Sequence, residues 1–166
     1  MKWSERMLWE GEEVGTWDKN YLGLCDHIKS WSKDPSSQFG AAIVDGRGNP
    51  VSLGVNGFPR GLKDTEERWE DRALKYPRVI HAEKNAIFFA MGNLEGCTLY
   101  CNGVPCVTCA GDIAQVGINM IICYEPTEDY LKRWSVDDTV ESCLETGVKL
   151  RLVSRDNHKV TQAFGR

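Results

Sequence analysis

The sequence lacks any long hydrophobic run. Its longest apolar stretches, such as residues 86–91, are far shorter than the about 20 apolar residues that a membrane-spanning helix needs. Residues 1–15 mix charged side chains with Trp3 and Trp9, so this segment also lacks the apolar core of a signal peptide. Both absences argue against a transmembrane or secreted protein, and we expect a cytoplasmic protein with no membrane partner.

Positive charge is scarce as well. The 166 residues contain 20 Lys and Arg against 24 Asp and Glu, for a formal net charge of -4. A protein that binds a nucleic-acid polymer neutralises several phosphates and usually carries a basic patch for that purpose. The composition therefore disfavours a nucleic-acid polymer as partner. A small anionic ligand remains compatible, because it needs only a few local cations.

Internal repeats and low-complexity tracts are also missing. A chain of this length without them suits one domain and can bury roughly 70% of its unfolded surface. We interpret residues 1–166 as a single domain with a core at about 17–153, an N-terminal arm at 1–15 and a C-terminal tail at 154–166. The arm either docks through its tryptophans on the body or on a neighbouring subunit, or it frays.

Cysteine is present in an odd number, 7, without a secretory signal. This combination favours reduced thiols and metal binding over a disulfide framework. Most of the cysteines that fall in apolar segments are expected to be small core residues. These are Cys25, Cys97, Cys101, Cys123 and Cys143.

The two other cysteines and one histidine have the spacing of metal ligands. His81 precedes Glu83 by two residues, and Cys106 and Cys109 follow Pro105. A catalytic zinc takes three protein ligands and keeps one position open, so His81, Cys106 and Cys109 complete such a set. Glu83 is then free to move protons. The whole pattern, His-x-Glu followed by Pro-Cys-x-x-Cys, is the known signature of zinc-dependent nucleobase deaminases.

The spacing also predicts where these residues lie. Residues two apart do not share a helix face, so His81 and Glu83 converge only where a helix begins. Cys106 and Cys109 are three apart, share a face and follow a proline suited to a first turn. We therefore expect two helix N-termini to point at one metal, where their partial positive charge favours thiolates.

Each part of the pattern has a simpler explanation. A Cys-x-x-Cys pair alone is often a structural zinc knuckle or a redox pair, and a lone histidine is often a satisfied core residue. Cys101 is a rival ligand, although it falls at a strand end, where the pleat sets its direction. The catalytic interpretation explains more, because a structural site needs a fourth ligand and has no use for Glu83.

Hydrophobic periodicity predicts alternating helices and strands. Helices are expected at residues 17–31, at 65–76, from the His81 start to 91, at 106–116 and at 137–145. Strands are expected at 39–44, 51–55, 97–102, 118–124 and 148–153. This order predicts an α/β fold with a mixed sheet and helices on both faces.

Four local expectations can be compared with a structure. Thr16 is the candidate cap of the first helix. The helix at 86–91 is apolar nearly all round, so we expect burial on more than one side. Residues 148–153 alternate as in a half-exposed strand. The connection at 58–80 is long enough to be a lid or a binding loop, with a solvated surface excursion as the alternative.

The chain resembles the deoxycytidylate deaminases of the cytidine deaminase superfamily over most of residues 17–153. Beyond the zinc pattern, the likeness rests on the Ser-Lys-Asp-Pro loop at 32–35, the Asn-Gly-x-Pro-x-Gly loop at 56–61 and residues 75–87. The resemblance implies a three-layer α/β/α fold with a five-stranded sheet in the order 2-1-3-4-5. It also implies hydrolysis of dCMP to dUMP and ammonia, which supplies dUMP for thymidylate synthesis.

The same resemblance implies a set of substrate contacts. Asn56 would bond the sugar, and the backbone near Ala82 would read the base edge. Ser32, Lys33 and Tyr124 would lie near the 5′-phosphate, with an exposed surface lysine as the alternative for Lys33. Zinc would activate the attacking water, and Glu83 would carry its proton to the cytosine and then to the leaving amine.

Regulation is a further implication of the resemblance. It describes a homohexamer that dCTP activates and dTTP inhibits, each bound with Mg²⁺ at a site between subunits. The loop assigned to this effector contains Gly57, Phe58, Arg60, Gly61 and Lys63, and a simple turn is the alternative interpretation of it.

Two departures from the family pattern limit this transfer. Residues 58–80 contain neither Cys nor His, whereas some viral members bind a second, structural zinc there, so we expect one Zn²⁺ per chain. Asn119 and Met120 stand where a basic pair is usual. A phosphate role for that position is therefore not carried over.

Rival functions remain within and outside the superfamily. Related enzymes deaminate free cytidine, guanine, riboflavin precursors or tRNA adenosine. The acidic charge disfavours tRNA, and the two loops favour a nucleotide. A non-catalytic zinc module that recruits partners through the Trp-rich arm is a different class, in which Glu83 and an open coordination position serve no purpose.

Overall fold

The computed structural model describes residues 3–166 and is built around one mixed sheet. The strand order is β2-β1-β3-β4-β5-β6. Strands β3, β4 and β5 run parallel, β1 pairs antiparallel with both β3 and β2, and β6 pairs antiparallel with β5. The bounds are β1 Gly40–Val44, β2 Pro50–Val55, β3 Thr98–Cys101, β4 Met120–Tyr124, β5 Lys149–Val153 and β6 Val160–Phe164.

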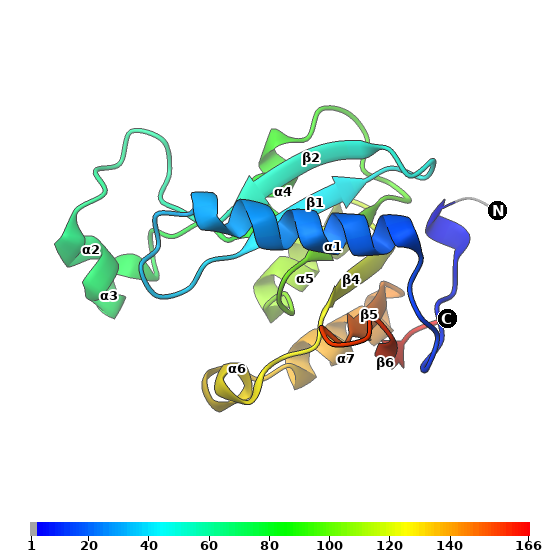
Figure 1. Cartoon of the computed structure of the whole chain (residues 1–166). Coiled ribbons are helices and arrows are strands. Elements are labelled where there is room, and N and C mark those ends of the chain that lie inside the picture. Colours follow the sequence, from blue (N-terminus) through cyan, green and yellow to red (C-terminus); the bar gives the residue numbers. More distant parts are fainter. Residues whose placement is uncertain (1–2) are drawn as a thin grey trace.

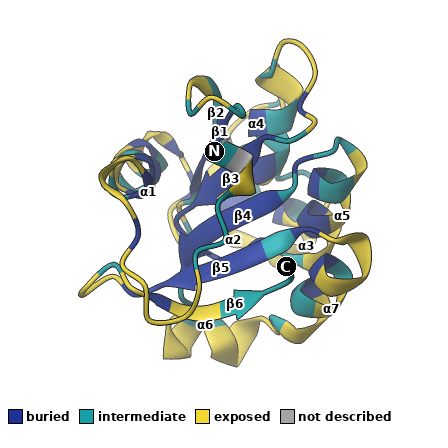
Figure 2. Ribbon diagram, turned by 90° about the vertical axis from the view of Figure 1, so that its right-hand side faces the viewer, coloured by how far each residue is buried: buried dark blue, intermediate teal, exposed yellow. Residues whose placement is uncertain are grey.

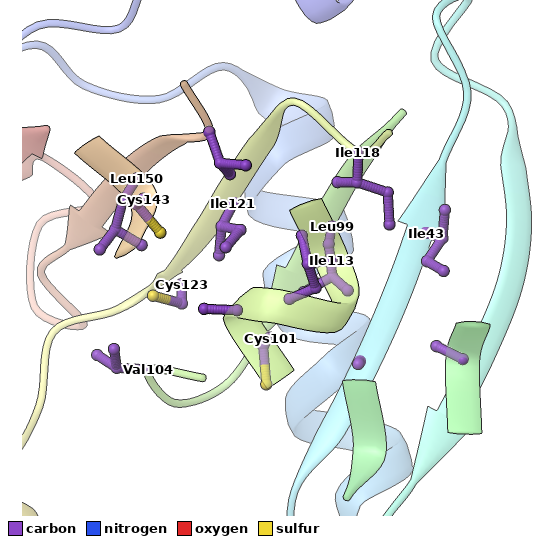
Figure 3. Packing of buried hydrophobic residues seen from close by; sticks show 14 of the residues in the cluster. Ile43, Leu99, Cys101, Val104, Ile113, Ile118, Ile121, Cys123, Cys143 and Leu150 are labelled. Atoms are coloured by element: carbon purple, nitrogen blue, oxygen red, sulfur yellow. The ribbon is translucent and has the colours of Figure 1, made fainter. Parts of the chain in front are cut away.

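Helices cover both faces of the sheet, as the sequence predicts. Helix α1 (Thr16–Ile28) lies on one face, and α4 (Ala82–Phe89), α5 (Val107–Gln115) and α7 (Asp137–Thr146) lie on the other (Figures 1 and 2). The larger core cluster fills the space beneath these three helices, where Ile113 of α5 packs near Leu99 of β3 (Figure 3). The α/β/α fold class and the order 2-1-3-4-5 are therefore confirmed.

The five-strand count was wrong. Strand β6, which lies in the segment interpreted as a polar tail, pairs antiparallel with β5. The error has a physical cause: β6 is a short edge strand in which Thr161 and Gln162 interrupt the apolar residues, so it lacks a clear alternating hydrophobic signal.

Three short helices project from one end of the molecule (Figure 1). They are α2 (Glu66–Glu70), α3 (Arg72–Lys75) and α6 (Glu128–Arg133). The single helix expected at 65–76 is split at Asp71, whose extended backbone ends α2 while its side chain caps α3 at Ala73. The sequence interpretation did not include α6.

The first helix begins as expected but with a different cap. Thr16 is the first helical residue, and Gly15 occupies the N-cap position. The cap interaction comes from Asp18, whose Oδ2 accepts from the Gly15 N–H at 3.0 Å. The helix ends at Ile28 and continues as a 3₁₀ turn, Lys29–Trp31.

The expectation that the α4 helix is buried on more than one side was wrong. Phe88 is 61% exposed, Phe89 51% and Met91 93%, so α4 is buried along one side and leaves aromatic side chains in solvent. Gly54 of β2 explains the close approach on the buried side, because a Cβ at this position would meet the Ala82 carbonyl at 2.3 Å.

Strand β5 is buried on both faces, which corrects the half-exposed prediction. Arg151 is fully buried, and its guanidinium donates to the carbonyls of Met7, Leu150, Phe164 and Gly165. The arm and β6 together cover the position that the alternation assigned to solvent.

The N-terminal arm docks on the body from Trp3 onward, and its first two residues lie outside the described part. Trp3 Nε1 donates to the Tyr100 hydroxyl at 3.1 Å, and Arg6 pairs with buried Asp18 at 2.6 Å. A 3₁₀ turn, Trp3–Glu5, starts the described arm. Within residues 3–166, no helix has the length and apolar character that crossing a membrane requires.

Candidate metal centre and adjoining cavity

Two helix starts meet at one point on the carboxyl side of the sheet. His81 is the N-cap residue of α4, and Glu83 lies in its first turn. Cys106 is the N-cap residue of α5, and its Sγ accepts from the Cys109 N–H at 3.5 Å. The placement predicted from the two- and three-residue spacings is therefore confirmed.

Three potential ligand atoms cluster where these helices begin. His81 Nδ1 lies 3.5 Å from Cys106 Sγ and 3.4 Å from Cys109 Sγ. All three atoms lie within 4.8 Å of one another. Tetrahedral zinc with ordinary Zn–N and Zn–S bonds places nitrogen and sulfur ligands about 3.6 Å apart, so this donor set fits zinc in type and spacing.

The charge state of the cluster also suits a soft divalent cation. The pKa of Cys106 is lowered to about 4, because the Cys109 thiol donates to its sulfur and His81 adds a second hydrogen bond against the effect of burial. The pKa of Cys109 is correspondingly raised. The hydrogen bond between His81 and Cys106 raises the pKa of His81. The site thus stabilises a thiolate, the form that binds metal.

Glu83 lies beside the cluster without belonging to it. Its side chain is buried, and burial raises its pKa. Oε1 lies 3.4 Å from Sγ of Cys101, the rival ligand of the sequence interpretation. Among the residues that the structure describes, the ligand cluster holds His81, Cys106 and Cys109 and leaves Cys101 out.

A cavity of about 680 Å³ opens over the cluster. His81, Glu83 and Cys106 lie in its wall. The remaining lining comes mainly from loop 34–39, the α2–α3 insertion and the α6 segment, with Asn56 after β2 and Val104 after β3. It comprises Asp34, Pro35, Ser36, Ser37, Phe39, Asn56, Trp69, Glu70, Arg72, Lys75, Tyr76, Val79, Val104, Tyr130, Arg133 and Trp134.

The outer wall of this cavity is aromatic and partly cationic. Tyr76, next to α3, and Trp134, at the end of α6, face each other edge to face with ring centroids 6.2 Å apart. Arg72 and Arg133 line the same wall. Tyr130 anchors α6 to the body through its hydroxyl, which donates to the Val104 carbonyl at 2.7 Å. Such a wall suits a planar ring that carries an anionic group.

The sequence interpretation named the 58–80 connection as a lid or binding loop, which agrees with its place in this wall, but it missed α6. Weak signals for it exist: Thr127 is an N-cap residue followed by two acidic residues, which marks the start of α6. The aromatic residues near 69–76 mark the insertion as more than a solvated loop. Neither signal shows that the two segments, about 60 positions apart, meet across one cavity.

Of the expected substrate residues, Asn56 lines the large cavity and Ala82 directly follows His81. Asn56 lines the cavity, but its side-chain oxygen accepts from the Phe39 N–H and its nitrogen donates to the Ser37 carbonyl. Ala82 is buried as the first residue of α4. Ser32 is buried too, and its hydroxyl donates to the Asn56 carbonyl at 2.7 Å.

The two other expected phosphate contacts lie elsewhere. Lys33 is 73% exposed at its side chain and pairs with Asp64 at 3.0 Å. Tyr124 is buried at the end of β4, where Arg155 stacks over its ring at 4.0 Å. Among the described residues that line the large cavity, neither of these two occurs.

The loop assigned to an effector borders a second, smaller cavity of about 360 Å³, which Gly57 and Phe58 line. Phe58 stacks on Trp69 with centroids 3.9 Å apart, and Arg60 lies 5.1 Å from the Phe89 ring. Gly61, with φ +84°, allows the tight turn in which the Leu62 N–H donates to the Pro59 carbonyl. The Lys63 carbonyl accepts from Arg68 at 2.9 Å.

Comparison with known proteins gives a consistent result. The family model described as the cytidine and deoxycytidylate deaminase zinc-binding region matches residues 15–125. An "uncharacterized deaminase in luxG 3′ region" of Aliivibrio fischeri is 43% identical over 121 residues, which are 73% of this chain and 81% of that protein. Human deoxycytidylate deaminase is 38% identical over 112 residues, which are 64% of this chain and 63% of that protein. The match therefore spans less than two thirds of the human relative.

Solved structures share the fold. The dCMP deaminase of cyanophage S-TIM5, solved with dCMP and dUMP, superimposes with a TM-score of 0.69 and 21% identity over 86% of this chain and 100% of that one. Acinetobacter baumannii RibD gives a TM-score of 0.59 and 16% identity over 82% of this chain and 35% of that one. At these identities the likeness describes the architecture alone.

Proposed function

Because the chain belongs to the cytidine and deoxycytidylate deaminase family, we propose that it hydrolyses dCMP to dUMP and ammonia in the cytoplasm. The observation that carries this proposal is the cluster of His81, Cys106 and Cys109 at the edge of a large cavity, with the buried carboxyl of Glu83 beside it. The names of relatives support the choice of substrate, since human deoxycytidylate deaminase shares the matched region.

We propose that His81, Cys106 and Cys109 hold one Zn²⁺ per chain. Bound there, zinc supplies Lewis-acid activation of a water and lowers its pKa from ~15.7 toward ~7. The helix starts that position the two cysteines favour their thiolate form, and the imidazole of His81 is fixed at the cap of α4.

Glu83 would perform the proton transfers. Its carboxylate takes a proton from the attacking water and delivers it to N3 of the cytosine. The same group then takes the proton of the new hydroxyl at C4 as the carbonyl forms and gives it to the amine, which leaves as ammonia. A positioned acid/base group of this kind contributes about 10² to 10⁴ in rate. Burial, which raises the pKa of Glu83, favours a group that both accepts and returns a proton.

The cavity suggests how a nucleotide would bind. Following the family resemblance, Asn56 bonds the sugar and the backbone at Ala82 meets the base edge. The 5′-phosphate has two candidate sites: Ser32, Lys33 and Tyr124 by resemblance, or Arg72 and Arg133 by position in the cavity wall. We favour the arginines, because Lys33 is paired with Asp64 and Tyr124 is covered by Arg155.

Regulation belongs to the proposal as well. Gly57, Phe58, Arg60, Gly61 and Lys63 would bind the triphosphate of dCTP as activator or dTTP as inhibitor, each with Mg²⁺. The family resemblance suggests that a homohexamer completes this site. The smaller cavity beside Gly57 and Phe58 supports a ligand there.

A substrate panel tests the proposed activity. The zinc-loaded protein is mixed with dCMP, CMP, deoxycytidine, dCTP or a single-stranded oligonucleotide, with and without dCTP or dTTP plus Mg²⁺, and deamination is followed by absorbance. We expect the highest kcat/KM with dCMP. A preference for deoxycytidine or CMP would indicate another small-molecule deaminase of the family. Absence of turnover with every cytosine compound would exclude the proposal.

A further inference from the structure

Glu83 has one side-chain partner within the described chain, and that partner is a cysteine. Cys101 ends β3, its side chain is fully buried, and its Sγ lies 3.4 Å from Glu83 Oε1. In Figure 3 the Cys101 sulfur points away from Leu99 and Ile113, the core residues that surround the rest of its strand. The contact therefore joins the central sheet to the first turn of α4.

The chemistry of this contact assigns the donor. Burial is the largest of the effects that raise the pKa of the Cys101 thiol well above its ordinary value, so the sulfur keeps its proton at neutral pH. The Gly103 backbone contributes a hydrogen bond to the same sulfur. Because the sulfur accepts this bond from the backbone, its S–H proton is available to donate to the Glu83 carboxylate.

Cys101 has no place in the metal cluster. The ligand atoms of His81, Cys106 and Cys109 group together, and over residues 3–166 the Cys101 sulfur does not join that group. Apart from Cys101, the Glu83 carboxyl receives a hydrogen bond from its own backbone N–H, and the terminal torsion of a glutamate is broad in energy. One donor from the rigid sheet limits that rotation.

We propose that Cys101 is a positioning residue that orients the Glu83 carboxylate toward the metal cluster through an S–H···O hydrogen bond. This inference rests on the proposed deaminase function. It deepens that function by assigning a role to a cysteine that the composition alone places among the core residues. Orientation matters here because misplacement of a reacting group by about 1 Å can cost 10²-fold in rate.

Three variants separate this role from simple packing. Cys101→Val keeps the approximate volume and removes the donor, whereas Cys101→Ser restores one. Cys143→Val is the matched control, because Cys143 is a buried cysteine of the same core cluster, on α7. With dCMP as substrate, we expect Cys101→Val to lower kcat about tenfold while KM changes less than about twofold, and Cys101→Ser to recover most of kcat. The control should retain wild-type kcat.

Infrared spectroscopy provides a readout that does not depend on turnover. The S–H stretching band of Cys101 is identified as the band that Cys101→Val removes. In zinc-loaded protein with Glu83→Gln, replacement of the carboxylate by an amide weakens the acceptor, so this band should shift to higher wavenumber. The band of the other buried thiols should stay in place, and zinc content should equal that of wild type in every Cys101 variant.

The outcomes distinguish this inference from the proposed function. If the wild-type protein deaminates none of the substrates but the S–H band shifts in Glu83→Gln, the proposed deaminase function is wrong and the Cys101–Glu83 hydrogen bond is supported. If the wild type is active and Cys101→Val has the same kcat, the positioning role is wrong. It is also wrong if the S–H band has the same wavenumber in Glu83→Gln as in wild type. Loss of zinc from Cys101→Val would overturn it too, because Cys101 would then be a ligand.

Discussion

The ammonium group of Lys75 lies 2.8 Å from Oδ2 and 2.9 Å from Oδ1 of Asp34, and both side chains are buried. This ion pair joins α3 of the insertion to loop 34–39, and both segments line the large cavity. Lys75 also donates to the Ser36 hydroxyl at 2.9 Å. The pair thus determines where one wall of the cavity stands.

Loss of the ammonium should destabilise the fold. Lys75→Met leaves the Asp34 carboxylate buried without its cation, so we expect the free energy of unfolding to fall by about 3–5 kcal/mol in urea titrations. Lys33→Met is the control, because the Lys33–Asp64 pair is exposed and should cost less than about 1 kcal/mol. Equal effects of the two substitutions would contradict the buried pair.

The same pair predicts a dependence on pH. Burial acts to raise the pKa of Asp34, but hydrogen bonds from Lys75 and from the Ser36 and Ser37 N–H groups outweigh it and lower the pKa. A lowered carboxyl pKa stabilises the fold fully above the unfolded value and loses this effect as pH falls through the folded value. In Lys75→Met, burial still raises the pKa of Asp34, but the ammonium that lowers it is gone. The stability gap between wild type and variant should therefore narrow as pH falls from about 7 to about 3.

Glu83→Gln should strongly lower turnover without loss of metal. The amide cannot accept the water proton, so we expect kcat to fall by about 10² to 10⁴ while zinc content stays at one per chain. Metal analysis and dCMP turnover on the same sample measure both. An active variant would exclude Glu83 as the proton carrier.

Removal of a proposed zinc ligand should, in contrast, lower the affinity for zinc. Cys106→Ala leaves two donors, and we expect zinc affinity to drop by more than about 100-fold, as judged by competition with a chelator. Cys97→Ala, at a buried cysteine far from the cluster, is the control and should retain zinc. Full occupancy in Cys106→Ala would point to Cys101 as the substitute ligand.

The phosphate contact can be assigned by comparing two cations. Arg133→Ala should raise KM for dCMP about tenfold or more and leave KM for deoxycytidine unchanged, because a hydrogen bond to a charged group contributes about 1.5–3 kcal/mol. Lys33→Ala is the parallel variant and should leave both values unchanged. If Lys33→Ala raises KM for dCMP and Arg133→Ala does not, the phosphate binds at the site that the family resemblance implies.

Arg60→Ala should weaken any response to dCTP. Its guanidinium lies over the ring of Phe89, a residue that lines the smaller cavity. We expect the dCTP concentration for half-maximal activation to rise about tenfold, with zinc content and basal kcat unchanged. Arg47→Ala, in the turn between β1 and β2, is the matched surface control. An unchanged response would remove this loop from the regulatory site.

The candidate cluster was predictable because its signals are local. His81 and Glu83 are two residues apart, Cys106 and Cys109 are three apart, and helix starts direct each pair. The alternating periodicities predicted a mixed sheet with helices on both faces, whereas the strand order came from the family resemblance. Exposure of Phe88 and burial of Arg151 were mispredicted, since both depend on what packs against a strand or helix from elsewhere in the chain.

By itself, the sequence determined the fold class and the meeting of an imidazole, two thiols and a carboxyl. Only the tertiary structure decided the cavity, the pairing of Tyr76 with Trp134 and the contact between Cys101 and Glu83. The physical reason is range: capping and periodicity act over a few residues, whereas a cavity wall forms from segments whose contacts no local pattern encodes.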